Sequence, residues 1–171
     1  MERLGELVEG LLALARADAG SEAALVVDVV VLARQRIEHW RALAEERSVT
    51  LTTPAGEERA LARAAPERVV QVLDNLLANA LEASPRGSVV AVSVLAARAA
   101  VELHVRDEGP GLSADERARA FDRFWRLRQD RGGSGLGLAI VRRLVEVDGG
   151  EAELVAAPGG GLEAIVRLRS A

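Results

Sequence analysis

The chain has 171 residues, of which 49% are hydrophobic, and a formal net charge of -4. This fits one compact α/β domain with a short appendage and argues against disorder, and the charge gives no reason to expect a nucleic-acid partner. All 22 basic residues are arginine and cysteine is absent, which excludes phosphate sites built on lysine, disulfides and thiolate metal sites.

The first predicted element is a helix over residues 2–17, where leucines recur at spacings of three and four. Such a seam requires a partner helix, so the segment is interpreted as the end of a longer bundle; packing on its own domain is the alternative. After a linker over 17–22, the pattern predicts a strand over 23–27. Asp28 is then a suitable N-cap for a helix that ends near Arg47.

The next segment contains two predicted strands and a long helix. The strands cover 49–53 and 58–63, on either side of a turn at 54–56. Pro66 suits the first position of the following helix, which we expect to end near Ser84 because proline comes next.

The last third of the chain predicts two hairpins with helical sequence between them. A polar helical stretch follows the first hairpin, and a glycine-rich segment then opens a second helix. The expected ranges are 88–96 and 100–106 for the first hairpin, 113–130 and 132–147 for the helical parts, and 151–157 and 162–168 for the second hairpin.

Two asparagines stand one turn apart on the predicted helix that begins at Pro66. Asn75 and Asn79 share a narrow stripe with Gln71 and Glu82, opposite an apolar face. Asparagine is a poor interior helix residue, and its amide oxygen is a hard, neutral ligand that suits Mg²⁺ bound to phosphate oxygens. A merely solvated polar face is the alternative.

Asp107 ends the apolar face of its predicted strand and is followed by Gly109-Pro110-Gly111. A buried carboxylate must be hydrogen-bonded, and glycines allow backbone to approach a planar ligand closely. The pattern suits recognition of the exocyclic amine of adenine; an ordinary turn is the alternative.

The glycine-rich segment from Gly132 to Gly137 opens an apolar helix, so free N–H groups at the helix start could face an anion. It fails the dinucleotide fingerprint because Ile140 replaces the third glycine. Before it, Phe121 and Phe124 could simply be core residues, but arginines follow them in a combination that suits a mobile lid over phosphate.

Taken in order, these segments resemble the histidine kinase branch of the superfamily that also contains gyrase B, HSP90 and MutL. QVLDNLLANA is similar to its asparagine box, DEGPGL to its first glycine box, FDRFWR to its phenylalanine box and GSGLGLAIV to its second glycine box. The resemblance covers about residues 23–169. In addition, RLGELVEGLLALARADAG resembles the end of the second helix of a kinase dimerisation and phosphotransfer domain, which disfavours the related anti-sigma-factor serine kinases.

The resemblance implies an α+β fold, a two-layer α/β sandwich called the Bergerat fold, with a mixed five-stranded sheet packed against three helices. Residues 1–20 would be the bundle stub and linker, and 21–171 the catalytic domain. The implied cofactors are ATP and Mg²⁺, with Asn79 as the metal ligand and Asn75 in support. The implied ATP-binding residues are Asn75, Asn79, Glu82, Asp107, Gly109, Gly111, Leu112, Phe121, Phe124, Arg126, Arg131, Gly133, Ser134, Gly135, Leu136, Gly137 and Leu138.

By the same resemblance, the domain would present the γ-phosphate to a histidine on its own dimerisation domain, in a homodimer that passes phosphate to a response regulator. The only histidines, His39 and His104, precede Trp40 and Val105 rather than an acidic residue, so the acceptor and its base are expected to be absent and the start at Met1 artificial. The chain would be a cytoplasmic domain of a protein anchored in the bacterial plasma membrane.

The sequence departs from the family pattern at two positions. Glu82 stands where a lysine usually contacts phosphate, and Asp148 where a histidine usually precedes Gly149-Gly150. Glu82 favours an alternative in which the domain is a degenerate nucleotide-binding regulatory module without phosphotransfer. The change at Asp148 is expected to matter little.

Overall fold

The computed structural model describes residues 8, 12, 15, 23–126 and 134–171, without the side chains of 54–56. In these parts of the chain a five-stranded sheet has the order β2-β4-β5-β7-β6, and β1 pairs with β3 in a separate two-stranded sheet. The strands are β1 (Leu25–Asp28), β2 (Thr50–Gly56), β3 (Leu61–Ala64), β4 (Val89–Ala96), β5 (Ala100–Arg106), β6 (Glu151–Ala156) and β7 (Leu162–Arg169). β2 and β4 are parallel and the other neighbours antiparallel, so the large sheet is mixed, as predicted.

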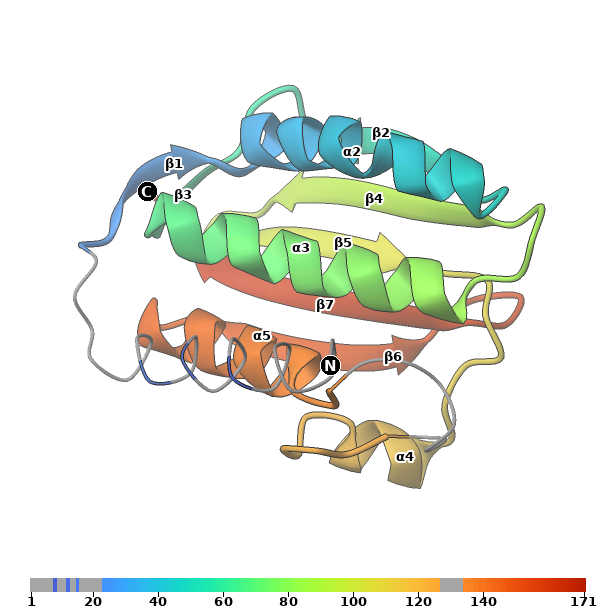
Figure 1. The fold of residues 1–171 in the computed structure, drawn as a ribbon. Helices are drawn as coiled ribbons and strands as arrows, with labels where there is room; N and C mark the ends of the chain where they lie inside the picture. Colours follow the sequence, from blue (N-terminus) through green and yellow to red (C-terminus); the bar gives the residue numbers. More distant parts are fainter. Residues whose placement is uncertain (1–7, 9–11, 13–14, 16–22, 127–133) are drawn as a thin grey trace.

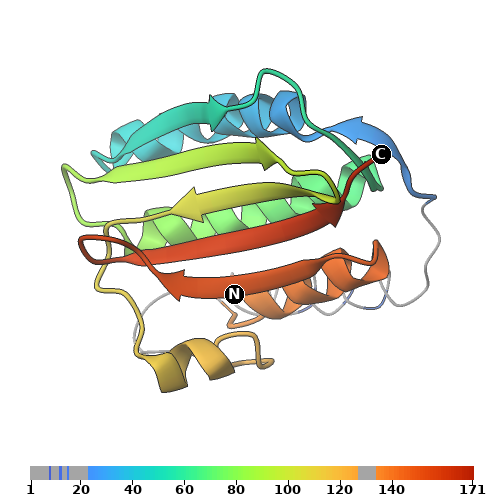
Figure 2. The same ribbon diagram turned by 180° about the vertical axis from the view of Figure 1, so that it is seen from behind.

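Three helices cover one face of the large sheet (Figure 1): α2 (Val29–Glu46), α3 (Pro66–Ala83) and α5 (Gly137–Val147). Among the residues that the structure describes, no helix lies on the opposite face (Figure 2). Along β5, Val101, Leu103 and Val105 are buried, whereas the alternate residues are half-buried or, at Arg106, exposed. The two-layer sandwich expected from the sequence is therefore confirmed, with the core between the sheet and these helices.

The starts of α2 and α3 follow the sequence-based predictions. Asp28 is the N-cap of α2, and its Oδ1 accepts a hydrogen bond from the backbone N–H of Val30 at 3.1 Å. Pro66 is in the first turn of α3, where its missing N–H costs no hydrogen bond. The core face of α2 includes Ala33, Ile37 and Ala44, all of which are buried.

The predicted turn at 54–56 is wrong, because β2 continues to Gly56. The pairing with β4 shifts register between Thr52 and Ala55. β2 is an edge strand, where a register shift accommodates a proline that cannot donate to the ladder. The second strand of this region is also displaced from its predicted range and covers Leu61–Ala64.

The predicted helix over 113–130 is too long. α4 covers Ala114–Arg119 and begins with a capping box in which Ser113 and Glu116 bond to each other's backbone N–H. Phe121 then enters the core, and Phe124 has a φ of 64°, which is incompatible with a right-handed helix. Residues 127–130 lie outside the described part of the chain.

At the N-terminus, Val8, Leu12 and Ala15 are helical and exposed. The predicted leucine seam lies outside the described residues, as does the proposed boundary at residue 20. Among the helices that the structure describes, none combines the length and apolar character needed to span a bilayer.

Candidate functional site

The two asparagines of α3 differ in exposure and in bonding. Asn75 is half-buried, and its Nδ2 donates to the carbonyl oxygen of Gln71 at 2.8 Å, so its donor group is bound within its own helix. Asn79 is exposed. Its amide oxygen is therefore the more accessible of the two to a metal ion.

The opening of α5 packs directly against these asparagines. A methyl group placed on Gly137 would lie 3.1 Å from Asn75 Oδ1 and 3.5 Å from Asn79 Nδ2. The fold thus brings together two segments that are far apart in the sequence, and glycine allows their close approach. Any larger residue at 137 would press on the Asn75 amide.

The start of α5 presents backbone rather than side chains. Leu136 is fully buried and supplies no side-chain cap, and the half-buried Leu138 packs on the core. Ser134 Oγ accepts from the Leu136 N–H at 3.4 Å. The uncapped N–H groups of the first turn can receive an anion, as at other helix starts.

Asp107 is buried directly after β5, with 5% of its surface exposed. Its Oδ1 accepts from the backbone N–H of Gly109 at 2.8 Å and of Leu162 at 3.2 Å. Both bonds go to the same oxygen, so Oδ2 takes part in neither. Burial raises the pKa of this carboxyl above its usual value, and the bonds from Gly109 and Leu162 limit the rise.

The turn after Asp107 is held between α3 and the β6–β7 turn. A methyl group on Gly109 would lie 2.8 Å from the Ala83 carbonyl oxygen at the end of α3. Gly111 has a φ of 70°, and a methyl group there would lie 2.9 Å from the Gly161 carbonyl oxygen. Neither position has room for a side chain without displacing backbone.

Gly161 and Leu162 are parts of this site that the sequence reasoning missed. Gly161 has a φ of 91°, and a methyl group there would collide with the Asp107 carbonyl oxygen. Leu162 forms two hydrogen bonds with Asp107. Its N–H donates to the Asp107 carboxylate, and its carbonyl oxygen accepts from the Asp107 N–H at 2.9 Å. The run of three glycines before Leu162 was the available signal.

The two phenylalanines have different surroundings. Phe121 is buried, whereas Phe124 is 56% exposed. The Phe124 N–H donates to the carbonyl oxygen of Gly135 at 2.9 Å, and a methyl group on Gly135 would lie 3.0 Å from Arg126 Cγ. This places Arg126 beside the glycine-rich segment. Arg131 and Gly133 lie outside the described residues, and half-buried Leu112 packs on the core.

Glu82 is exposed in the last turn of α3, three residues after the exposed Asn79. Arg86, four residues further on, directs its guanidinium elsewhere, because it donates to Ser48 Oγ at 3.0 Å. The Glu82 carboxylate is therefore not offset by that hydrogen-bonded cation.

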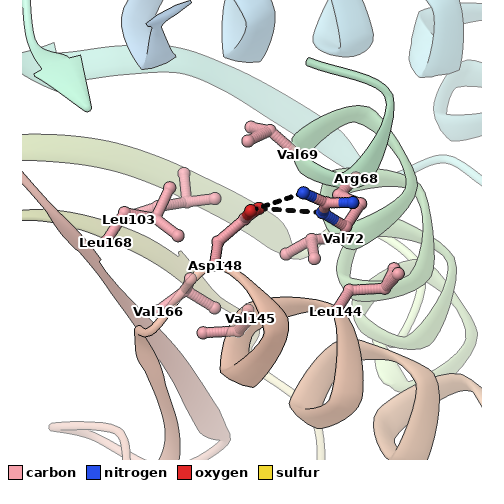
Figure 3. A pocket seen from close by; sticks show the side chains of 9 residues that line it. All are labelled: Arg68, Val69, Val72, Leu103, Leu144, Val145, Asp148, Val166 and Leu168. Atoms are coloured by element: carbon pink, nitrogen blue, oxygen red, sulfur yellow. Dashed lines mark hydrogen bonds and ion pairs between the residues drawn. The ribbon is translucent and has the colours of Figure 1, made fainter. Parts of the chain in front are cut away.

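The expectation that Asp148 matters little is wrong for the fold. Its carboxylate forms a two-pronged ion pair with Arg68, at 2.7 Å and 3.1 Å, and the side-chain exposures are 6% for Arg68 and 2% for Asp148. Asp148 also accepts from the Ala65 N–H at 3.2 Å. Figure 3 shows the pair beside a small cavity lined mainly by valines and leucines of α3, α5 and the sheet. Asp148 thus joins the end of α5 to the start of α3.

No cluster of histidine or acidic side chains suited to holding a metal occurs among the described residues. The available donor is the amide oxygen of Asn79. Such a donor set fits Mg²⁺ that is carried in with phosphate oxygens and keeps most of its waters.

Residues 64–171 match the family model described as "Histidine kinase-, DNA gyrase B-, and HSP90-like ATPase". The chain is 38% identical over 161 residues to the sensor protein DivL of Caulobacter vibrioides, covering 93% of this chain and 21% of that protein. It is 40% identical over 169 residues to the signal transduction histidine-protein kinase AfsQ2 of Streptomyces coelicolor, covering 97% of this chain and 30% of that protein. The chain therefore spans less than a third of either relative.

Solved structures show the same fold. The crystal structure of full-length ShkA in complex with AMPPNP superimposes with a TM-score of 0.83 at 32% identity, covering 96% of this chain and 36% of that one. The mycobacterial sensor histidine kinase MprB gives a TM-score of 0.70 at 29% identity, covering 86% of this chain and 97% of that one.

Proposed function

Because the chain belongs to the histidine kinase-, DNA gyrase B- and HSP90-like ATPase family, as the ATP-binding domain of a sensor histidine kinase, we propose that it binds ATP with Mg²⁺ and presents the γ-phosphate to a histidine of the parent protein's dimerisation domain. The observation that carries this proposal is the position of α3. Its C-terminal half borders both the Asp107 turn, through Ala83 and Gly109, and the start of α5, through Asn75 and Gly137. The proposed base site and the proposed phosphate site thus adjoin one helix.

The base end of the ligand would contact Asp107. Its Oδ2, which takes part in neither backbone bond, would accept from the exocyclic amine of adenine. Gly109 and Gly111 would flank the ring, because the absence of side chains there leaves backbone as the pocket wall. Hydrogen bonds from Gly109 and Leu162 hold the carboxylate in this orientation.

The phosphate end would lie at the start of α5. The uncapped N–H groups of its first turn, near Gly135 and Gly137, would bind phosphate oxygens. Asn79 would hold Mg²⁺ with Asn75 in support, and the bound ion would neutralise charge that develops on the phosphates. Arginines at 126 and 131 would assist, the second of them outside the described residues.

The reaction would be an in-line displacement, in which an imidazole nitrogen attacks the γ-phosphorus, the bond to the β–γ bridging oxygen breaks and ADP leaves. This chain's residues would bind and orient ATP, and the nucleophile would come from the parent's dimerisation domain. His104 is unsuited to that role, because its Nδ1 lies 2.9 Å from Glu163 and its Nε2 3.2 Å from Glu102. His39 is exposed on α2, remote in sequence from the boxes.

In the parent protein, the acceptor would lie in a homodimer at the cytoplasmic side of the membrane and pass phosphate to a response regulator. The degenerate alternative, a domain that binds nucleotide without transferring phosphate, is favoured by Glu82 in place of lysine. The two proposals differ in the fate of the γ-phosphate.

Calorimetry with ATP, ADP and adenosine, with and without Mg²⁺, tests binding. Labelled ATP should then give acid-labile phosphate on the parent's dimerisation domain when this is supplied in trans, and none on this chain alone. Labelling of His39 or His104 would contradict the assignment of the acceptor. Tight Mg·ATP binding without transfer to the supplied domain would establish the degenerate module instead.

A further inference from the structure

Arg142 of α5 lies over the ring of Phe121, with its guanidinium carbon 4.2 Å from the ring centroid. Phe121 is 7% exposed and belongs to the core. A guanidinium at this distance from an aromatic face is attracted by the negative face of the ring. The contact therefore attaches the segment that follows α4 to the outer surface of α5.

A second contact attaches the same segment a few residues later. The Phe124 N–H donates to the Gly135 carbonyl oxygen at 2.9 Å, immediately before α5 begins. Phe124 and Gly135 have φ values of 64° and 69°, so both ends of this bond have left-handed backbone. Left-handed backbone is unfavourable for phenylalanine, which means that the surrounding contacts must hold this geometry in place.

Trp125 directly follows Phe124 and is suited to report on the position of this segment. It is half-buried and packs on the core, and its backbone N–H donates to the Asp122 carbonyl oxygen at 3.2 Å. Its packing depends on where the segment from Phe121 to Arg126 lies relative to α5. The other tryptophan, Trp40, is on α2 and donates to Asp74 at 2.7 Å, in a different part of the fold.

We propose that Arg142 is a positioning residue for the phosphate end of the nucleotide site. Acting through Phe121, it fixes the segment from Phe121 to Arg126 against α5. That segment is bonded to Gly135 and thereby fixes the backbone at the start of the helix. The proposal rests on the proposed function for its nucleotide consequence, but the attachment itself is a property of the free protein.

Variants that keep or remove the charge of Arg142 distinguish this positioning role from simple shielding of the Phe121 ring. Lysine keeps a cation and part of the attraction, whereas alanine removes both cation and stem. Arg41→Ala is a matched control, because it removes the same charge from a helix surface where the arginine pairs with Glu38. A contact between an exposed arginine and an aromatic face changes an equilibrium by about two- to fivefold.

The first measurement is made without nucleotide, in a Trp40→Phe background where Trp125 is the only tryptophan. Acrylamide should quench Trp125 about two- to fivefold more efficiently in Arg142→Ala than in the chain that carries only Trp40→Phe. Arg142→Lys should recover part of the protection, and Arg41→Ala should leave it unchanged. Unchanged quenching in Arg142→Ala, or a lysine variant as quenchable as the alanine variant, would overturn the proposal.

The second measurement compares ligands. ATP affinity should fall about two- to fivefold in Arg142→Ala while adenosine affinity stays the same, because the base pocket at Asp107 lies on another element. Equal losses for both ligands would indicate general destabilisation and overturn the positioning role. If the parent chain bound neither ligand, the proposed function would fail, and the quenching result would still decide the attachment.

Discussion

The Cα of Gly137 faces the Asn75 amide so closely that an added methyl group would lie 3.1 Å from Asn75 Oδ1. Alanine at 137 would favour the helix intrinsically, by about 1 kcal/mol over glycine. In this site, however, it would displace the Asn75 amide and the start of α5 together. The first turn of a helix would thus be stabilised at the expense of the proposed phosphate site.

We therefore expect Gly137→Ala to weaken ATP binding while adenosine binding is unchanged. Truncating Asn75 removes the atom that the new methyl group meets, so the two substitutions should be non-additive. A double-mutant cycle with Asn75→Ala, measured by calorimetry, should give a coupling of about 0.5–3 kcal/mol. Strict additivity would mean that the two residues do not contact each other in solution.

Asp107→Asn should preserve the fold and weaken nucleotide binding. The asparagine oxygen can replace Oδ1 and keep the bonds from Gly109 and Leu162. The new amino group then replaces Oδ2 and points two donors at the adenine amine, which we expect to cost ~2 kcal/mol. ATP, ADP and adenosine should weaken alike.

The control for this substitution is Asn79→Ala, which should affect chiefly the Mg²⁺-dependent part of ATP binding. Calorimetry with and without Mg²⁺ distinguishes the two effects. Unchanged ADP affinity in the Asp107 variant would place the base pocket elsewhere.

Adenosine affinity should depend on pH through Asp107. Burial raises the pKa of this carboxyl in the folded protein, so as the pH falls the native state takes up a proton before the unfolded state does. The destabilising effect of the buried charge is present above the raised pKa and relieved below it. We therefore expect that protonation of Asp107 leaves the domain folded but removes the acceptor that we propose for the adenine amine.

The measurement is adenosine binding by calorimetry from neutral pH downward, together with the melting temperature at each pH. Affinity should fall at a higher pH than an ordinary aspartate would give. Protonation of adenine itself is common to all variants, so Asp107→Asn provides the baseline. A parent chain whose pH profile matches that of the asparagine variant would exclude Asp107 as the acceptor.

Most individual strands and helices could be predicted from local periodicity or a capping residue, whereas the mixed sheet under three helices and the roles of the four boxes came from the family resemblance. Asp28 illustrates the first case, since its role as N-cap requires only its neighbours. The convergence of Asn75 with Gly137 could be expected only through the resemblance, since neither residue specifies the distance to the other.

What the sequence could not give were contacts between distant segments. The hydrogen bond from the Leu162 N–H to Asp107 depends on how the last hairpin packs, and the pairing of Arg68 with Asp148 depends on how two helices pack. The turn predicted at 54–56 is wrong for a related reason. A proline in an extended segment indicates a turn unless the strand is known to be at an edge with a register shift.

Breaking the Arg68–Asp148 pair should destabilise the domain strongly. Asp148→Ala removes the buried carboxylate that pairs with Arg68, and breaking a buried ion pair typically costs about 3–5 kcal/mol. Arg68→Met combined with Asp148→Leu removes both charges beside a cavity already lined by apolar residues. The double variant should therefore recover most of the lost stability.

Urea unfolding of both variants and the parent chain measures this difference in free energy. A double variant no more stable than Asp148→Ala would mean that hydrogen bonding of Asp148 to Ala65, rather than charge pairing, dominates the contribution of this residue.

Glu82 is exposed one turn beyond the predicted metal ligand Asn79, and Arg86 bonds to Ser48 instead of offsetting it. Its carboxylate should repel the phosphates, and exposure to solvent limits the effect to that of a surface charge pair, about 0.2–1 kcal/mol. Glu82→Lys reverses the sign and should tighten ATP binding about two- to fivefold at low salt, with a smaller gain at high salt. Adenosine affinity should not change, because adenosine has no phosphates for residue 82 to attract or repel. A general stabilisation of the fold would instead raise the affinity for both ligands. Calorimetry of ATP and adenosine at two salt concentrations tests this, and equal or weaker ATP binding by the lysine variant would show that residue 82 points away from the phosphates.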